Sequence, residues 1–291
     1  MLTTRLLPYD GGVVEYGVAD VSGTRHTSSG SAVSDSTLFL HGLAGSIEDT
    51  RPLASGVPGR KVFAHLPGHG RSTGPDPLTY AALAAAARAV ADHEHARAAL
   101  GVSLGAATLL RLLAETPDRF ERIVLFLPAV ADVPRPPESL APHLLLADRL
   151  AAKDAEGVAE ALLRTQPEAV RTTPIARDWA ARRAADLIAE GGDPRRLLPL
   201  ASALPLDAPG LDKLRAVRTP VLVIAQEGDP AHPVAVARRI SEALPVSDLA
   251  IFDSRGALWG HRRELRERVA PFIAPSSVPS STGVRSVTNT A

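Results

Sequence analysis

Short runs of apolar residues, each bounded by glycine, proline or polar residues, alternate along this chain with longer amphipathic segments. Short apolar runs are typical of strands buried on both faces, and the longer segments are typical of helices that cover a sheet. We therefore predict an α/β fold, with a mostly parallel sheet of eight strands flanked by helices. Because the first two predicted strands lie close together in the chain, we expect them to pair antiparallel. The predicted strands are Leu2–Leu7, Val13–Val18, Thr37–Leu40, Lys61–Ala64, Ala96–Val102, Arg122–Leu127, Val221–Ala225 and Leu249–Phe252.

Three amphipathic segments predict helices that pack on this sheet. They are Leu104–Glu115, Val234–Leu244 and Arg262–Ile273. In each, apolar residues recur at intervals of three or four, so a helix would present one apolar stripe to the sheet.

Residues 128–219 interrupt the alternation of strands and helices. The segment opens with the proline-rich stretch VPRPPESLAP and continues with Ala, Leu and Arg at helical spacing, without a convincing strand. We expect a helical cap inserted after the sixth strand, with residues 1–127 and 220–274 forming the α/β core. Residues 275–291 are rich in Ser, Thr and Pro and have little to bury, so we expect a disordered tail.

The expected cap carries both apolar and basic side chains. The apolar ones are candidates for lining a substrate pocket, although a cap also buries such residues for its own packing. They are Leu144, Leu145, Leu146, Leu150 and Trp179. The basic ones are expected mostly to form a solvated face paired with Glu and Asp. They are Arg164, Arg171, Arg177, Arg182, Arg183, Arg195 and Arg196.

Composition and charge exclude several classes of protein. The 32 Lys and Arg residues balance 32 Asp and Glu residues, and a neutral chain without a basic block does not resemble a nucleic-acid binder. The absence of cysteine excludes disulfides, thiolate nucleophiles and Cys-based zinc sites. No segment has the apolar length of a membrane span, and the first residues, MLTTRLLPYDGG, lack the features of a secretory signal. We therefore expect a cytoplasmic protein with no membrane partner.

The most informative segment is the G-x-S-x-G pentapeptide Gly101-Val102-Ser103-Leu104-Gly105, between a predicted strand and a predicted helix. A strained turn at this place would lift the Ser103 hydroxyl clear of the sheet. Side chains at the two glycine positions would collide with neighbouring backbone. The N-terminus of the following helix also favours negative charge at the reacting centre. The pattern predicts Ser103 as a nucleophile.

Two further segments resemble those of the α/β-hydrolase fold family. Thr37–Ser46 (TLFLHGLAGS) is similar to the H-G-x-x-G segment after the family's third strand, and Ala64–Ser72 (AHLPGHGRS) is similar to its D-x-x-G-x-G-x-S segment. The resemblance extends from about residue 2 to residue 273 and implies a serine hydrolase. It also implies an oxyanion hole made by the backbone N–H groups of Leu43 and Leu104.

Some histidines in these segments need a separate interpretation. His65 stands where the family usually has Asp, and Val102 precedes the serine where His is frequent. Both departures leave the nucleophile in place but remove a basis for choosing a subfamily or a substrate. We expect His41 to stabilise its loop without transferring protons, and His69 to be structural or pocket-lining.

In this family the acid of the triad follows the serine in the chain, and the histidine follows the acid. Asp229, in a Gly-Asp turn after the strand Val221–Ala225, matches the acid. Asp132, after the sixth strand, and Asp253, after the eighth, are the alternatives. The choice of Asp229 over Asp132 stays open.

Among the nine histidines of the sequence, His232 and His261 follow this acid. His232 lies three residues from Asp229 and would have to turn back across its own loop to reach Ser103. A helix and a strand separate His261 from Asp229. We therefore predict that Ser103, Asp229 and His261 meet at the carboxyl edge of the sheet, where open α/β sheets bind ligands.

This triad predicts the hydrolysis of an ester, thioester or lactone of a small molecule through an acyl-enzyme. The alternatives are a C–C bond hydrolase or cofactor-free perhydrolase of the same fold, and a ligand-binding protein with negligible turnover. We expect no metal and no cofactor, because His93-Glu94-His95 lacks the H-E-x-x-H spacing of a zinc helix.

Overall fold

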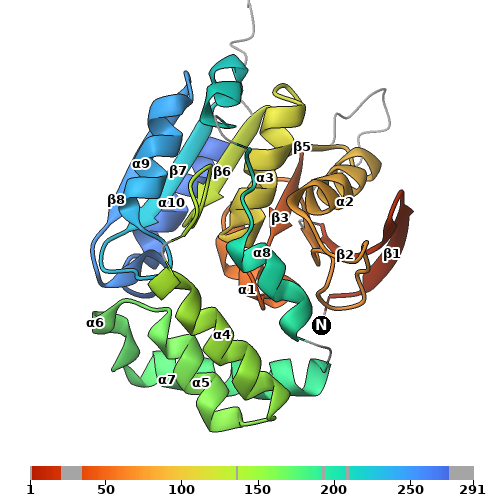
Figure 1. Cartoon of the computed structure of the whole chain (residues 1–291). Helices are drawn as coiled ribbons and strands as arrows, with labels where there is room; N and C mark the ends of the chain where they lie inside the picture. The colour runs from red at the N-terminus through yellow and green to blue at the C-terminus, as the bar shows by residue number, and fades with distance from the viewer. Residues whose placement is uncertain (1, 21–34, 136, 192–193, 208–209, 275–291) are drawn as a thin grey trace, which may run out of the picture.

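The computed structural model describes residues 2–20, 35–135, 137–191, 194–207 and 210–274. One sheet of eight strands forms its centre, in the order β1-β2-β4-β3-β5-β6-β7-β8 (Figure 1). The predicted α/β fold with a mostly parallel eight-stranded sheet is confirmed, whereas the expected tail, 275–291, lies outside the described residues. The strands are β1 Thr4–Tyr9, β2 Gly12–Ala19, β3 Ser36–Leu40, β4 Arg60–Ala64, β5 Ala96–Val102, β6 Arg122–Phe126, β7 Val221–Gln226 and β8 Ser247–Phe252.

The sheet begins antiparallel and continues parallel. Strand β2 pairs antiparallel with both β1 and β4, while every pairing from β4 to β8 in the sheet order is parallel. Parallel strands end at the same edge of a sheet, so the loops that follow β3, β4, β5 and β7 come together there. These loops carry the residues singled out by sequence.

Helices cover both faces of the sheet. Apolar residues of α2 (Tyr80–His93), α3 (Leu104–Glu115) and α9 (Val234–Ala243) belong to the buried cluster on one face. Those of α1 (Ile47–Thr50), the 3₁₀ helix η1 (Arg51–Ala54) and α10 (Arg262–Ile273) belong to the cluster on the other. In the described part of the chain, no helix combines the length and apolar character needed to cross a bilayer.

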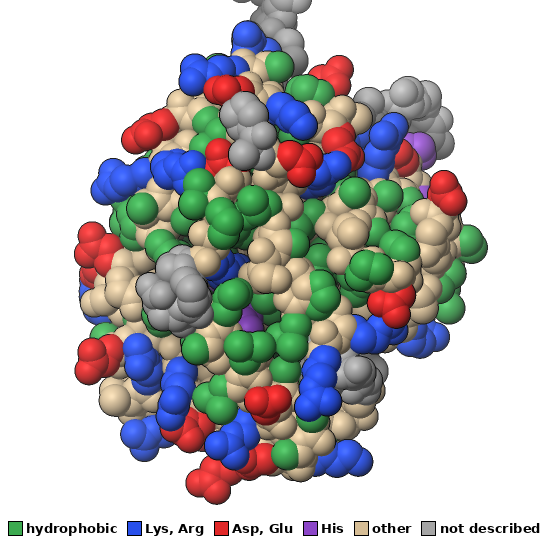
Figure 2. All heavy atoms as spheres, viewed as in Figure 1, with side chains coloured by type: hydrophobic (Ala, Val, Ile, Leu, Met, Phe, Trp, Pro, Cys, Tyr) green, Lys and Arg blue, Asp and Glu red, His purple; other side chains and the backbone are tan. Residues whose placement is uncertain are grey.

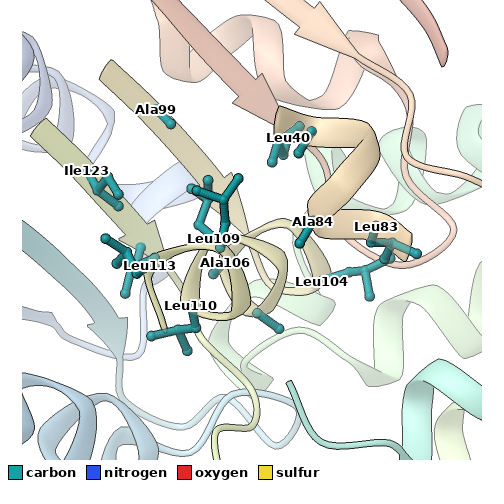
Figure 3. Close-up of a cluster of buried hydrophobic side chains, with 14 of the residues drawn as sticks. Leu40, Leu83, Ala84, Ala99, Leu104, Ala106, Leu109, Leu110, Leu113 and Ile123 are labelled. Carbon is teal, nitrogen blue, oxygen red and sulfur yellow. The ribbon is translucent and has the colours of Figure 1, made fainter. Parts of the chain in front are cut away.

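Helix α3 lies at the centre of the larger cluster (Figure 3). Leu109, Leu110 and Leu113 are fully buried and pack with Leu83 of α2 and Ile123 of β6. A helix that is apolar on almost every side is stable only when neighbours surround it. This packing fixes the start of α3, and therefore Ser103, relative to the sheet.

Between β6 and β7 the chain forms helices, and no strand occurs in the described residues of this segment. They are α4 Pro137–Ala151, α5 Ala155–Arg164, α6 Glu168–Arg171, α7 Pro174–Glu190, η2 Pro194–Leu197, α8 Leu198–Ser202 and η3 Gly210–Ala216. Helices α4 to α7 lie together beside the core (Figure 1) and are called the cap below. The cap has its own apolar cluster, formed by α4, α5 and α7, whereas Leu200 of α8 and Leu214 of η3 pack with the larger cluster of the core.

Candidate active site

Ser103 lies in a strained turn between β5 and α3. Its φ of 50° and ψ of −101° fall in a region that residues other than glycine rarely adopt. A Cβ atom at Gly101 would meet the carbonyl oxygen of Gly105, and one at Gly105 would meet the carbonyl oxygen of Leu40. Both flanking positions therefore require glycine, as the sequence analysis expected.

His232 is the histidine beside Ser103. Its Nε2 lies 3.0 Å from Ser103 Oγ, and its Nδ1 lies 2.8 Å from Asp229 Oδ2. Because a carboxylate accepts hydrogen bonds, Nδ1–H donates to Asp229. Nε2 is then left to accept the serine O–H. The three side chains form one continuous hydrogen-bonded chain from hydroxyl to carboxylate.

His261 lies away from this chain of hydrogen bonds, so the prediction that it pairs with Ser103 is wrong. Its Nε2 lies 2.8 Å from Asp253 Oδ1, and its Nδ1 lies 3.3 Å from Glu264 Oε2. It stands immediately before α10, with both ring nitrogens facing carboxylates.

The turn after β7 explains why His232, and not His261, reaches the serine. Asp229 Oδ1 accepts hydrogen bonds from the backbone N–H groups of Ala231 and His232, at 2.9 and 3.1 Å. This is an Asx-type turn, in which an aspartate folds the following residues back over its own side chain. The turn places the ring of His232 beside the other carboxylate oxygen. An Asp-Pro-x-His-Pro sequence (229–233) was the signal that could have revealed it.

Asp229 is buried and held by a residue that sequence reasoning missed. Gln226, the last residue of β7, donates from Nε2 to Asp229 Oδ2 at 2.7 Å. Its Oε1 accepts the backbone N–H of Ala257 at 2.9 Å. Burial by itself would raise the pKa of the Asp229 carboxyl, but the charge of His232 and the hydrogen bonds that the carboxyl accepts lower it. Asp229 therefore stays ionised and can orient the imidazole.

The two alternative acids are paired elsewhere. Asp132 Oδ1 accepts a hydrogen bond from Arg239 Nη2 at 2.7 Å. Hydrogen bonds from Arg255 and His261 hold the pKa of Asp253 well below its ordinary value. Among the described residues, Asp229 is the carboxylate that contacts the histidine beside Ser103.

The loop after β3 lies against Ser103. A Cβ atom on Gly42 would be 3.5 Å from the Cβ atom of Ser103. Gly105 donates its N–H to the carbonyl of His41 at 3.0 Å, which ties the start of α3 to the same loop. In the described part of the structure, the N–H groups of Leu43 and Leu104 donate to no other group. Leu104 directly follows Ser103, and Leu43 directly follows Gly42, the residue of this loop that lies against Ser103.

His41 is fully buried beneath this loop. Its Nδ1 lies 2.7 Å from the carbonyl oxygen of Gly42, and its Nε2 accepts the backbone N–H of Leu66 at 3.1 Å. Burial, with His69 and His65 nearby, lowers the pKa of His41 well below its ordinary value. A neutral ring with both nitrogens occupied fits the expected structural role.

A cavity of about 810 Å³ reaches from Leu43 and Ala44 to the cap, a volume typical of small-molecule sites. Leu146 and Leu150, both candidates for lining a pocket, border it, whereas Trp179 borders a different cavity of about 750 Å³. On the face shown in Figure 2, apolar side chains gather where the cap meets the core, and charges of both signs surround them. Among the described residues, no group of three or more His, Asp or Glu side chains could hold a metal ion.

Comparisons with known proteins agree with this architecture. The model of the alpha/beta hydrolase family matches residues 37–269. The solved structures that resemble the chain include MGS-M2, an alpha/beta hydrolase enzyme from a Medee basin deep-sea metagenome library. Its TM-score is 0.74, and the two sequences are 16% identical over 95% of this chain and 100% of that one. Carboxylesterase CesB from Bacillus subtilis has a TM-score of 0.73 and 19% identity over 94% and 92% of the two chains. The enol-lactonase from Burkholderia xenovorans LB400 has a TM-score of 0.72 and 19% identity over 92% and 99%. None of the curated proteins matches the sequence.

Proposed function

This chain belongs to the alpha/beta hydrolase family, and we propose that it is a serine hydrolase that cleaves an ester, thioester or lactone of a small molecule. Ser103 is the nucleophile, His232 the general base and acid, and Asp229 the residue that orients His232. The N–H groups of Leu43 and Leu104 stabilise the oxyanion.

The observation that carries this proposal is the hydrogen-bonded chain from Ser103 through His232 to Asp229. A serine hydroxyl is a weak nucleophile unless a neighbouring base accepts its proton. The distances of 3.0 and 2.8 Å are those of a base within reach of its nucleophile and an acid within reach of its base. A strained backbone at Ser103 is also expected where a fold stores strain for function.

Acylation follows from this geometry. As Ser103 Oγ attacks the carbonyl carbon of the substrate, Nε2 of His232 takes the hydroxyl proton. The imidazolium that forms is stabilised by the ionised carboxylate of Asp229. The negative oxygen of the tetrahedral intermediate accepts hydrogen bonds from the two free N–H groups, and the N-terminus of α3 adds a favourable field. The imidazolium then gives its proton to the departing alcohol or thiol.

Deacylation reuses the same groups. His232, neutral again, takes a proton from a water molecule as that water attacks the acyl carbon on Ser103. The second tetrahedral intermediate uses the same two N–H donors. It collapses when His232 returns the proton to Ser103 Oγ, which releases the carboxylic acid. For a lactone, the leaving oxygen remains attached to the released acid as a hydroxyl group.

The similar structures support ester chemistry in a coarse sense. One is a carboxylesterase and another an enol-lactonase, and both activities use the attack of a nucleophile on an acyl carbon. At identities below 20%, the likeness concerns the fold, and function must be argued from the site.

The test is turnover of p-nitrophenyl esters of two to eight carbons, a thioester and a γ-lactone, each measured beside Ser103→Ala. The proposal expects turnover with an initial burst of one p-nitrophenol per chain, because the acyl group stays on Ser103 until water attacks it. Peptide mapping should find a fluorophosphonate probe attached at Ser103. An unlabelled Ser103, under conditions where a known serine hydrolase reacts, overturns the proposal. Without ester turnover, cleavage of a diketone would identify a C–C bond hydrolase, and formation of a peracid would identify a perhydrolase. Binding of a ligand without any turnover would identify a ligand-binding protein.

A further inference from the structure

Ala44, the residue after the proposed oxyanion donor Leu43, has a left-handed backbone. Its φ is 53° although it is not glycine, and residues with a side chain rarely adopt this conformation. Such a conformation persists when the surroundings hold the residue on several sides. Ala44 is held in this way by groups from both the core and the cap.

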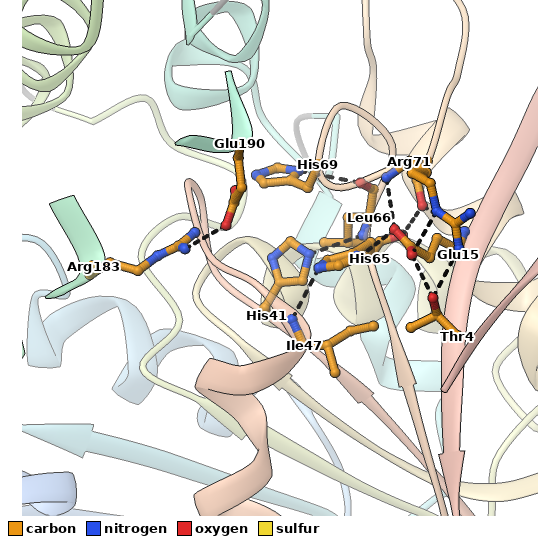
Figure 4. Close-up of polar contacts among 11 residues, drawn as sticks. Thr4, Glu15, His41, Ile47, His65, Leu66, His69, Arg71, Arg183 and Glu190 are labelled. Atoms are coloured by element: carbon orange, nitrogen blue, oxygen red, sulfur yellow. Dashed lines mark hydrogen bonds and ion pairs between the residues drawn. The ribbon is translucent and has the colours of Figure 1, made fainter. Parts of the chain in front are cut away.

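The core holds the N–H of Ala44 through His69, whose contact with Leu66 is drawn in Figure 4. His69 Nε2 accepts this N–H at 3.2 Å, and Nδ1 lies 3.3 Å from the carbonyl oxygen of Leu66. With a carbonyl at one nitrogen and an N–H group at the other, the ring must be neutral with its hydrogen on Nδ1. Burial lowers the pKa of His69 to about 4, which agrees with this state at neutral pH.

The cap holds the carbonyl of Ala44 through Arg183 of α7. Arg183 Nη2 donates to this oxygen at 2.8 Å, while Nη1 donates to Glu190 Oε1 at 2.8 Å. Arg183 is only 6% exposed, so the expectation that it belongs to a solvated face is wrong. The methyl group of Ala44 packs against the apolar cluster of the cap, which gives a reason for alanine here in place of glycine.

These contacts determine where the N–H of Leu43 points. A peptide group is planar, so its C=O and N–H point in opposite directions. His41 Nδ1–H and the N–H of Gly45 both donate to the carbonyl of Gly42, at 2.7 and 3.0 Å. These donors hold the Gly42–Leu43 peptide. His69 holds the next peptide through the N–H of Ala44, and Arg183 holds the one after it through the carbonyl of Ala44. With three successive peptides held, the Leu43 N–H keeps one direction and stays free to donate.

We propose that Arg183 and His69 are positioning residues for the oxyanion hole, and that Arg183 couples the cap to it. His41 and Gly45 hold the peptide that carries the Leu43 N–H, and His69 and Arg183 hold the two peptides that follow it, so that the loop cannot rotate. The hole is therefore complete when α7 is seated on the loop. This inference rests on the proposed function. Removal of one oxyanion donor lowers kcat about 10²–10³-fold in a serine hydrolase. Loosening the loop should produce a part of that loss, in kcat and not in KM.

The test compares pairs of variants at each position. Arg183→Met keeps the length of the side chain but removes its donors, and Arg183→Lys keeps one donor and the charge. His69→Leu removes the acceptor, and His69→Gln restores an acceptor through its amide oxygen. Arg182→Ala, an exposed arginine one residue away on the same helix, is the matched control. Circular dichroism checks that each variant is folded.

We expect Arg183→Met and His69→Leu to lower kcat on a p-nitrophenyl ester about 10–100-fold with KM within threefold of the wild type. Arg183→Lys and His69→Gln should recover most of the lost kcat, and Arg182→Ala should match the wild type. The proposal is overturned if both truncated variants keep kcat within threefold, if KM alone changes, or if His69→Gln is as impaired as His69→Leu.

Hydrogen–deuterium exchange of the peptide that spans residues 42–47 separates this inference from the proposed function. Exchange should become at least tenfold faster in Arg183→Met and His69→Leu and stay unchanged in Arg182→Ala. If the wild type neither turns over esters nor labels at Ser103, the proposed function fails while exchange still tests whether the two residues hold the loop. Unchanged exchange in both truncated variants would refute the inference whatever the activity.

Discussion

Two loops at the carboxyl end of the sheet each pair an aspartate with a histidine at the same distance. In the loop after β7, His232 Nδ1 lies 2.8 Å from Asp229 Oδ2, and in the loop after β8, His261 Nε2 lies 2.8 Å from Asp253 Oδ1. The side chain of Asp229 is 2% exposed and that of Asp253 is 47% exposed. The second ring nitrogen of His232 faces Ser103, whereas the second ring nitrogen of His261 faces the carboxylate of Glu264.

The comparison shows that an Asp–His pair does not by itself identify a catalytic base. An exposed pair is screened by water and contributes little, and the Asp253–His261 pair lies at the surface beside Arg255. A buried pair interacts in a medium of lower dielectric constant, so its carboxylate can stabilise an imidazolium effectively. What distinguishes the two loops is burial of the acid and contact of the base with a nucleophile.

The largest effect should come from removing the nucleophile that distinguishes the two loops. Ser103→Ala should lower kcat/KM for an activated ester about 10⁵-fold or more, because the remaining groups have no atom to acylate. Stopped-flow and steady-state assays on the same ester provide the measurement, with circular dichroism as the control for folding. Activity within tenfold of the wild type would show that the reaction proceeds elsewhere.

A smaller but still large loss is expected when the buried acid loses its charge. Asp229→Asn should lower kcat about 10³–10⁴-fold, because an amide neither fixes the same imidazole tautomer nor stabilises the imidazolium. Asp253→Asn, the matching change in the exposed pair, should leave kcat within twofold. Steady-state kinetics of the two purified variants measures both values of kcat. Equal losses of kcat in the two variants would show that the two loops do not differ in catalytic role.

Another carboxylate–histidine pair, Glu15 and His65, sharpens the comparison because it is mostly buried, while the second ring nitrogen of His65 accepts the backbone N–H of Ile47 and faces no serine hydroxyl. Burial by itself raises the pKa of Glu15, but hydrogen bonds from Arg71 and Thr4 lower it to about 2. A depressed pKa stabilises the fold above the ordinary titration range of a glutamate, and this contribution is lost as pH falls toward 2. Glu15→Gln should therefore reduce the free energy of unfolding by about 2 kcal/mol at pH 7.

Urea denaturation of the wild type and Glu15→Gln at pH 7 and at pH 3 measures this effect. The difference between the two proteins should be largest at pH 7 and smaller at pH 3, where the wild-type glutamate loses part of its advantage. A difference that grows as pH falls would contradict the ionised state of Glu15 in the fold.

Most of the fold could be predicted from sequence because its strands are buried on both faces. All six residues of β7 are buried, and such a run is recognisable without any partner. The bounds of α3 also match, since its apolar residues and the Gly-Ser turn before it are local signals. Strand β1 is displaced by two residues from its predicted range. As an edge strand without a fully buried residue, it takes its register from the hairpin with β2 and not from its own hydrophobicity.

The site could be predicted only where its residues carry a local pattern. Ser103 and its flanking glycines do so, because one turn determines all three positions. His261 is the better candidate only if acid and base need separate loops, but Asp229 folds its own loop back and presents His232. The contact between Arg183 and Ala44 joins residues 139 positions apart. No local pattern distinguishes such a buried arginine from the solvated ones beside it.

The most direct test of this account compares His232→Ala with His261→Ala on one activated ester, with both variants shown to be folded by circular dichroism. If His232 is the base, His232→Ala should lower kcat/KM about 10⁴–10⁶-fold, much as loss of the serine does, because triad members act as a unit. His261→Ala should stay within threefold of the wild type. An inactive His261→Ala beside an active His232→Ala would contradict the account.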